Sequence, residues 1–368
     1  MPEYSSPGVF VEEISDSSLP IAPCRTSVSA FVGHLPDVGL AIKTPIRVLE
    51  NGLTRVRYMD WPDCRLKRAI EGFFQNGGKD LWVLGLDADV TEVDGMYLGL
   101  LDDQLEINLL AAPGFVDVAS HTALIAHCEQ HGQRFAVLDG PEQVDNATVF
   151  ATEPLAPSGQ AALYVPWLQV PGRDEALPPS GHVCGIYARM DEQRGVWAAP
   201  VNFPMDGVVG LTQSLSNDDQ EGLNTLNVNA IRSFDARGIM MWGARTRAPA
   251  GHDMRYVPER RLMNMLEASL TKGIQWAVFH PNSTETWMQV RTSVEAFLTL
   301  VWQSGGVVGE TAEQAFFTRC GPETMTQSDL DQGRLICEVG VATQRPAEFS
   351  ILRLEVQTAD PEPDPPTE

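Results

Sequence analysis

The chain has 368 residues, of which 43% are hydrophobic and 20% are charged, and its formal net charge is -23 at pH 7. This length is enough for two or three domains with sizeable cores. The acidic surface would repel phosphate backbones, which disfavours direct nucleic-acid binding. No apolar run is long enough to cross a bilayer. The N-terminus lacks the basic start and apolar stretch of a signal peptide, and six scattered cysteines without a CxxC pair indicate unpaired thiols in a reducing compartment.

The first predicted element is an isolated strand. Pro7-Gly8 marks a turn, and four β-favouring residues follow it: Val9, Phe10, Val11 and Ile14. Residues 15–23 again have the composition of a loop, so the strand has no hairpin partner nearby. It must pair with a distant strand, either in this chain or on another molecule. We treat residues 1–24 as an extended N-terminal arm.

Strands then alternate with amphipathic helices through a first α/β unit, residues 25–215. The pattern predicts strands at 27–33, 81–86, 107–111, 135–138 and 161–165, and helices from Pro62 to about Gly77 and at 122–131. Such alternation favours a mostly parallel sheet covered by helices. Prolines and glycines from Pro171 to about Asp219 predict a loop-rich joint or a long surface excursion.

A second α/β unit is expected over residues 216–345, as the C-terminal domain. Its predicted elements are strands at 238–242 and 275–279, a helix at 260–272 and a long helix striped from Trp287 to Val301. Residues 346–357 follow as a C-terminal arm, a strand with Phe349 and Ile351 that places Leu352, Leu354 and Val356 on one side. Residues 358–368 are acidic and proline-rich, which predicts disorder.

Motifs that would carry chemistry are mostly missing. The sequence has no GxxxxGK[ST] phosphate loop, no HExxH and no GxSxG. His127 and His131 would share one face of a helix, as in a zinc site, but Cys128 points elsewhere, and a solvated helix end is the favoured alternative. Two acid pairs are better explained as solvated loops, namely Asp102-Asp103 and Asp218-Asp219. We therefore predict no catalytic, cofactor-binding or metal site, and no cofactor.

Several segments, in order along the chain, resemble contractile tail sheath proteins. The opening Ser5-Ser-Pro-Gly-Val-Phe-Val-Glu-Glu13 is similar to the start of that family. Pro178-Pro-Ser-Gly-His-Val-Cys-Gly-Ile-Tyr-Ala-Arg-Met-Asp191 is similar to its central signature. The match continues through Leu226-Asn-Val-Asn-Ala-Ile-Arg232, Phe279-His-Pro-Asn282 and Pro346-Ala-Glu-Phe349, whereas residues 90–170 carry no usable signature.

The resemblance implies a structural subunit that polymerises around an inner tube and contracts to drive that tube through a target envelope. The terminal arms would join β-sheets of neighbouring copies, with the first unit outermost and the C-terminal unit facing the tube. Adding a strand to an open sheet edge satisfies unpaired backbone groups, and head-to-tail contacts of this kind propagate as a filament. Implied partners are copies of the chain, the inner tube protein, and baseplate and terminal cap proteins, without nucleic acid or membrane insertion.

Arginines concentrate in the second unit of an otherwise acidic chain. Arg255, Arg260 and Arg261 are candidates for contact with the tube or a neighbouring copy, and ion pairing within the domain is the alternative. We expect assembly in the bacterial cytoplasm, as part of a phage tail or a phage-tail-like particle. Two other functions stay open: a cap or baseplate component with the same fold, and a soluble α/β enzyme with a cleft between its units.

Overall fold

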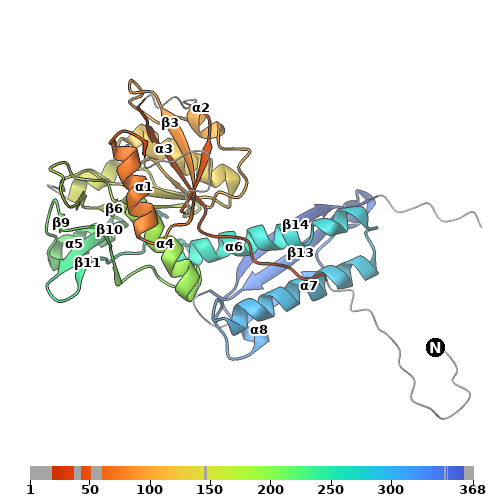
Figure 1. Cartoon of the computed structure of the whole chain (residues 1–368). Coiled ribbons are helices and arrows are strands. Elements are labelled where there is room, and N and C mark those ends of the chain that lie inside the picture. The colour runs from red at the N-terminus through yellow and green to blue at the C-terminus, as the bar shows by residue number, and fades with distance from the viewer. Residues whose placement is uncertain are drawn as a thin grey trace, which may run out of the picture.

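The computed structural model of the protein describes residues 19–36, 43–50, 60–144, 147–343, 345 and 347–359. These residues form two units, a large α/β unit and a smaller one built on a three-stranded sheet, with helix α6 (Val257–Gly273) running away from the first and along the second (Figure 1). The mixed α/β class predicted from the sequence is therefore confirmed. The predicted N-terminal strand with Val9, Phe10, Val11 and Ile14 lies outside the described residues. Of the tail predicted to be disordered, residues 358–368, Thr358 is buried and Ala359 pairs with Pro281, so the prediction is wrong for these two residues. The tail from residue 360 onward lies outside the described residues.

The first unit is built on a nine-stranded sheet in the order β2-β3-β1-β4-β5-β6-β10-β11-β8. The six strands from β3 to β10 are parallel, and antiparallel strands close both sides. The predicted parallel strands are thus present. The strand bounds are β1 Ser29–His34, β2 Ile46–Leu49, β3 Asp80–Leu86, β4 Leu109–Ala111, β5 Phe135–Asp139, β6 Ala161–Val165, β8 Phe203–Pro204, β10 Val228–Phe234 and β11 Gly238–Met241.

Helices cover both faces of this sheet, which is why its central strands are buried on both sides. Helices α1 (Arg65–Gln75) and α4 (Ser180–Arg194) pack on one face. Helices α2 (Gly95–Gly99), α3 (Val118–His131) and α5 (Asn217–Thr225) pack on the other. A 3₁₀ helix, η2 (Ala147–Thr152), and a short ribbon of β7 (Leu168–Gln169) and β9 (Gly210–Leu211) complete the unit.

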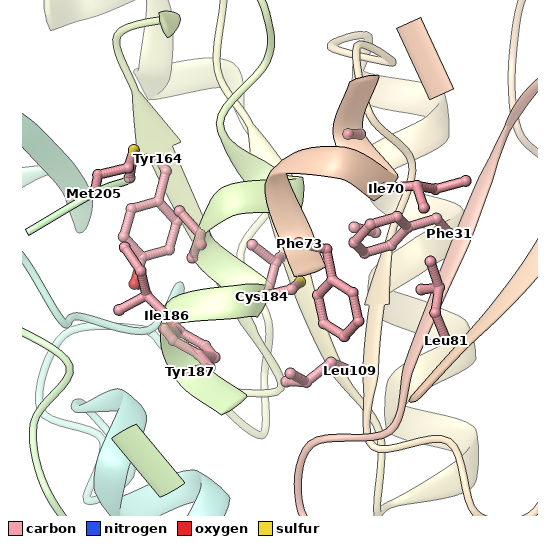
Figure 2. Close-up of a cluster of buried hydrophobic side chains, with 14 of the residues drawn as sticks. Phe31, Ile70, Phe73, Leu81, Leu109, Tyr164, Cys184, Ile186, Tyr187 and Met205 are labelled. Atoms are coloured by element: carbon pink, nitrogen blue, oxygen red, sulfur yellow. The ribbon is translucent and has the colours of Figure 1, made fainter. Parts of the chain in front are cut away.

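The core under α1 and α4 is made of alternate strand residues and the inner faces of the two helices. Phe31, Leu81 and Leu109 project from the strands toward Phe73 of α1 (Figure 2). Phe31 and Phe73 meet edge to face, with ring centroids 5.5 Å apart. Burial of this many large side chains accounts for most of the favourable free energy of the unit.

Helix α4 lies inside the segment that the sequence predicted to be loop-rich, so that prediction was wrong. The signal was hidden because α4 is buried nearly all round and shows no amphipathic stripe. Gly181 and Gly185 allow close contact with the backbone of α1: a Cβ would lie 2.5 Å from the carbonyl oxygen of Ala69 at the first position and 2.4 Å from that of Phe73 at the second. Asp139 of β5 accepts hydrogen bonds from the amide and hydroxyl of Ser180, both 2.7 Å, and fixes the N-terminus of α4.

The expected boundary at residue 216 was also misplaced. Strand β10 pairs with β6 of the first sheet, and β11 forms an antiparallel hairpin with β10. Both strands therefore belong to the first unit, because their unpaired edges are satisfied there and not in a second sheet. The second unit begins only near α6.

The second unit packs α6 and α7 (Thr284–Gln303) against an antiparallel sheet in the order β12-β13-β14. Its strands and short helices are α8 Ala312–Ala315, β12 Phe316–Cys320, α9 Gln327–Asp331, β13 Arg334–Val341 and β14 Ser350–Gln357. Residues Gln275–Phe279, predicted as a strand, form a 3₁₀ helix, η3. The segment follows α6 after one residue, so local turns that use the carbonyls of Ile274 and Ala277 as acceptors are formed instead of a ladder.

We predict that replacing Gly185 with valine forces α1 and α4 apart, because the new side chain meets the backbone oxygen of Phe73. The free energy of unfolding in urea should fall by about 2–4 kcal/mol. Gly95→Ala is the control, since a Cβ at that position meets nothing within 4 Å. Equal midpoints for the two variants would contradict the close packing of α1 on α4.

Candidate functional site

The C-terminal strand expected from the sequence is present as β14. It pairs with β13 through eight opposed residues, from Arg334 opposite Gln357 to Val341 opposite Ser350. Leu354 and Val356 are buried in the hydrophobic core of the second unit, whereas Arg353 and Glu355 are exposed. The predicted sidedness of this strand is confirmed.

Strand β14 forms an edge of its sheet. Its partner is β13 of the same chain, whereas the sequence led us to expect an arm that leaves the subunit. In a lone chain this pairing is favoured because a short connection, residues 342–349, brings the two edges together at small entropic cost. Exchange of β14 between copies stays a prediction.

The side chains of β14 and of the residue before it differ in how deeply they are buried. Phe349 comes just before β14 and packs edge to face on Phe317, with ring centroids 5.0 Å apart. Leu352 is half-buried at the margin of the core, and Ile351 is 54% exposed. The strand is thus attached mainly by its backbone ladder and by two buried side chains.

The junction between the two units contains a buried ion pair. Arg261 of α6 donates two hydrogen bonds to Asp191 of α4, at 2.9 Å and 2.6 Å, and both side chains are less than a tenth exposed. Thr26 joins this pair: its hydroxyl donates to Asp191 at 2.6 Å, and its carbonyl accepts from Arg261 at 3.0 Å. The guanidinium also lies over the ring of Tyr187, 4.7 Å from its centroid. These contacts bind α6, α4 and the segment before β1 to one another.

This geometry changes the interpretation of the arginine cluster. Arg261 is buried in the junction, so its predicted contact with a tube or neighbour is wrong, and its partner lies in the other unit. Arg260 is half-buried and donates to Asn264 at 2.8 Å. Arg255 is exposed. Asp191 was not singled out from the sequence, although an aspartate inside a buried helix would have indicated a charged partner.

Two of the candidate metal ligands, His127 and His131, lie close together, and the third group beside them is Asp102, not Cys128. Asp102 replaces Cys128, whose side chain is buried in the core, and the donor atoms of Asp102, His127 and His131 lie within 4.8 Å of one another. His131 Nε2 is 2.9 Å from Asp102 Oδ1. The cluster borders a groove of about 550 Å³ between α2 and α3.

Arg134 makes this cluster a poor metal site. Its guanidinium contacts His127 Nε2, and because arginine can only donate, that nitrogen must accept and Nδ1 must carry the proton. Nδ1 is the atom that faces Asp102, so it has no lone pair for a metal. Burial, with the nearby Arg134 charge, lowers the pKa of His127 to about 4. What remains is a solvated pair of His131 and Asp102.

The other candidate groups have structural roles. Asp219 completes a capping box with Ser216 at the start of α5, and its neighbour Asp218 is exposed in the first turn of that helix. Asp103 is exposed beside Asp102. All six cysteines are unpaired. No helix in the described ranges combines the length and the apolar character needed to span a membrane.

We predict that Arg261→Met lowers the free energy of unfolding by about 3–5 kcal/mol, because Asp191 is then left buried without its partner. The double variant Arg261→Met/Asp191→Leu should recover part of that loss in the same urea titration. Arg291→Met is the control: its i,i+4 pair with Glu295 is exposed and should contribute less than about 1 kcal/mol. A loss for Arg261→Met no larger than that of the control would contradict the role of the junction.

Two family models match the chain. Residues 92–247 match the phage tail sheath protein central domain, and residues 250–357 match the phage tail sheath C-terminal domain. A prophage major tail sheath protein of Pseudomonas aeruginosa (strain UCBPP-PA14) is 27% identical over 271 residues, which cover 70% of this chain and 68% of the relative. A tail sheath protein of Vibrio phage KVP40 is 22% identical over 51% of this chain and 28% of its own length.

Solved structures extend the likeness over nearly the whole chain. The helical sheath of the anti-feeding prophage in its contracted state is 35% identical, with a TM-score of 0.76 over 95% of this chain and 99% of the other. The sheath complex of the extracellular contractile injection system PVC, also contracted, is 31% identical, with a TM-score of 0.77 over 96% and 98%. The chain belongs to the phage tail sheath protein family and is a structural sheath subunit of a contractile phage tail or phage-tail-like particle.

Proposed function

We propose that copies of this chain polymerise around an inner tube and that the polymer contracts to drive the tube through a target envelope. The observation that carries this proposal is the likeness, at 35% and 31% identity over 95–96% of the chain, to two contractile sheaths in their contracted state. The family is a structural one, and we propose that the chain is not an enzyme. Assembly would take place in the bacterial cytoplasm.

The polymer would be held together by exchanged strands. If β14 of one copy pairs with β13 of the next, the eight opposed pairs of the lone chain are made again between copies. The two arrangements then differ little in contact energy, as in other domain swaps. Leu354 and Val356 would fill the same positions in the neighbour's core, and the segment 342–349 would span the gap.

The N-terminal arm would complete the same sheet. Among the described residues, the outer edge of β14 has no strand beside it, and β12 forms the opposite edge. Val9, Phe10, Val11 and Ile14 are strand-forming residues that would satisfy such an edge. Each copy would therefore both donate and accept strands, which gives an open, helical assembly.

We predict that a cysteine pair placed across the β13–β14 ladder forms disulfides between copies in the assembled sheath. Glu338 and Arg353 lie directly opposite each other, so the variant Glu338→Cys/Arg353→Cys has suitable geometry. Oxidised polymers should give a ladder of covalent multimers on a non-reducing gel. Each single-cysteine variant is the control, and a cross-linked band that stays at monomer size would contradict exchange of β14.

The inner tube would contact the C-terminal unit. Arg255 is the one of our three candidate arginines that remains exposed, and a cation at this place would suit an acidic partner surface. Baseplate and cap proteins would contact the ends of the polymer.

We predict that Arg255→Glu reduces co-sedimentation of the sheath subunit with its inner tube several-fold at low salt, because it introduces repulsion at the contact. Arg319→Glu is the matched control: Arg319 is also exposed but lies on β12 over the ring of Phe317. Equal co-sedimentation of the two variants would remove Arg255 from the tube contact.

A second candidate function is a sheath-fold component at the baseplate. Chains in structures of the anti-feeding prophage baseplate are 34% and 30% identical to this one, with TM-scores of 0.73 and 0.78. Electron microscopy of the assembled protein separates the two functions. Long cylinders support the sheath, whereas single rings support a baseplate component.

A further inference from the structure

The hairpin of β10 and β11 carries an unusual group of side chains near an open groove. Phe234 and Trp242 lie with ring centroids 4.6 Å apart. Arg237 lies over both rings, 4.7 Å and 5.6 Å from their centroids, and Arg232 lies 5.5 Å from that of Phe234. With Asn217, Gln220 and Glu221 of α5 they line a groove of about 400 Å³, which we call the hairpin groove.

The two arginines of the hairpin groove have neutral partners. Arg232 donates to Asn217 Oδ1 at 2.9 Å and to Gln220 Oε1 at 2.7 Å, and Arg237 donates to Asn202 Oδ1 at 3.0 Å. In the described part of the chain neither guanidinium forms an ion pair with a carboxylate. The chain carries 49 acidic and 26 basic residues, so two guanidinium groups without a carboxylate partner form a positive site in an acidic protein.

The chemistry of the hairpin groove defines what it would bind. Neighbouring aromatic rings, such as the tilted pair of Phe234 and Trp242, are the surface on which proline rings pack in grooves that recognise polyproline segments. Uncompensated guanidinium groups beside them select carboxylates. Glu221 on the α5 side would repel carboxylates there, so the acidic side chains of a ligand would have to face the hairpin. The groove therefore fits an acidic, proline-rich segment.

The chain contains one segment of this composition, Asp360-Pro-Glu-Pro-Asp-Pro-Pro-Thr-Glu368. Four prolines favour the extended polyproline conformation, and four carboxylates complement the arginines. In an acidic polymer such a segment is repelled by most of the surface, so a groove whose arginines have only neutral partners is a favourable place for it.

The segment of the same copy is badly placed to reach the hairpin groove. Ala359 pairs with Pro281, close to the C-terminal end of α6, whereas the amide of Val257 at the other end of α6 donates to Ala244, just after β11. The 17 residues of α6 span about 25 Å. Nine fully extended residues reach about 30 Å, so the length of α6 leaves only about 5 Å for the distance from Ala244 to the groove.

We propose that the hairpin groove binds the segment Asp360–Glu368 of a neighbouring copy. The assignment to a neighbour rests on the proposed polymer, whereas the chemistry of the groove does not. Each single contact would be weak, but a polymer repeats it at every subunit, so its effect is multiplied. The contact would add a link between copies that is separate from the sheet of the second unit.

Binding is tested with a fluorescein-labelled synthetic peptide of residues 358–368, titrated with the full chain and followed by anisotropy. We expect saturable binding that weakens several-fold between 50 mM and 300 mM NaCl. Trp242→Ala and Arg232→Ala/Arg237→Ala should each weaken it about ten-fold, as should a peptide with its acidic residues changed to amides. Arg319→Ala, which removes another exposed arginine over an aromatic ring, should leave it unchanged. Absence of binding, or equal binding by all variants with unchanged circular dichroism, overturns the proposal.

The occupant in the assembly is identified by placing a photo-cross-linking phenylalanine analogue at position 234. Polymers are grown from a mixture of ¹⁴N and ¹⁵N copies and analysed by mass spectrometry. Cross-links that join position 234 to residues 360–368 of a differently labelled copy support the proposal. Cross-links to another segment, or within one copy only, overturn it, while electron micrographs of the same sample report separately whether a sheath has formed.

Discussion

The buried pair of Arg261 and Asp191 fixes how the two units are joined. Removing two charges from water costs free energy that is recovered only when each keeps its hydrogen bonds, and here Thr26 and Tyr187 complete their surroundings. A small rotation of α6 against α4 would break these directional contacts while the charges remain buried. These contacts therefore favour one relative orientation of α6 and α4 over others.

The elements on the two sides of this junction differ in how many buried contacts hold them. On one side, α4 is held by close backbone contact with α1 and by Asp139 at its N-terminus. On the other side, β14 is attached at a sheet edge with two well-buried side chains. The proposed contraction would use both properties, because the bodies would move as units while the exchanged strands between copies adapt. The buried contacts of α4 with α1 and α6 lie at the centre of the molecule, and β14 lies at the edge of the second sheet.

The sequence predicted helices and strands well wherever the local pattern of apolar residues matched their burial in the fold. Parallel strands such as β3 and β5 appear as apolar runs, and α7 shows its buried stripe. Helix α4 was missed because burial on all sides removes the stripe and because Gly181 serves a helix contact, not a turn. The boundary and Arg261 were misjudged for a related reason. Which sheet accepts β10, and which carboxylate meets an arginine 70 residues away, are decided by tertiary contacts.

The pairing of β14 with its own β13 fits the proposed exchange. An exchanged strand must be protected before assembly, since an exposed ladder edge would pair with any other chain. Folding β14 back covers the edge of β13 with the hydrogen bonds that β14 would later make in a neighbour, and leaves the outer edge of β14 as the one open edge on that side of the described sheet. The free-energy difference between the closed and exchanged forms then comes from chain entropy and from the second strand, Val9–Ile14, that the polymer would add to the open edge. In the proposed exchange, assembly would be favoured by that added strand and by contacts between the bodies, not by β14 itself.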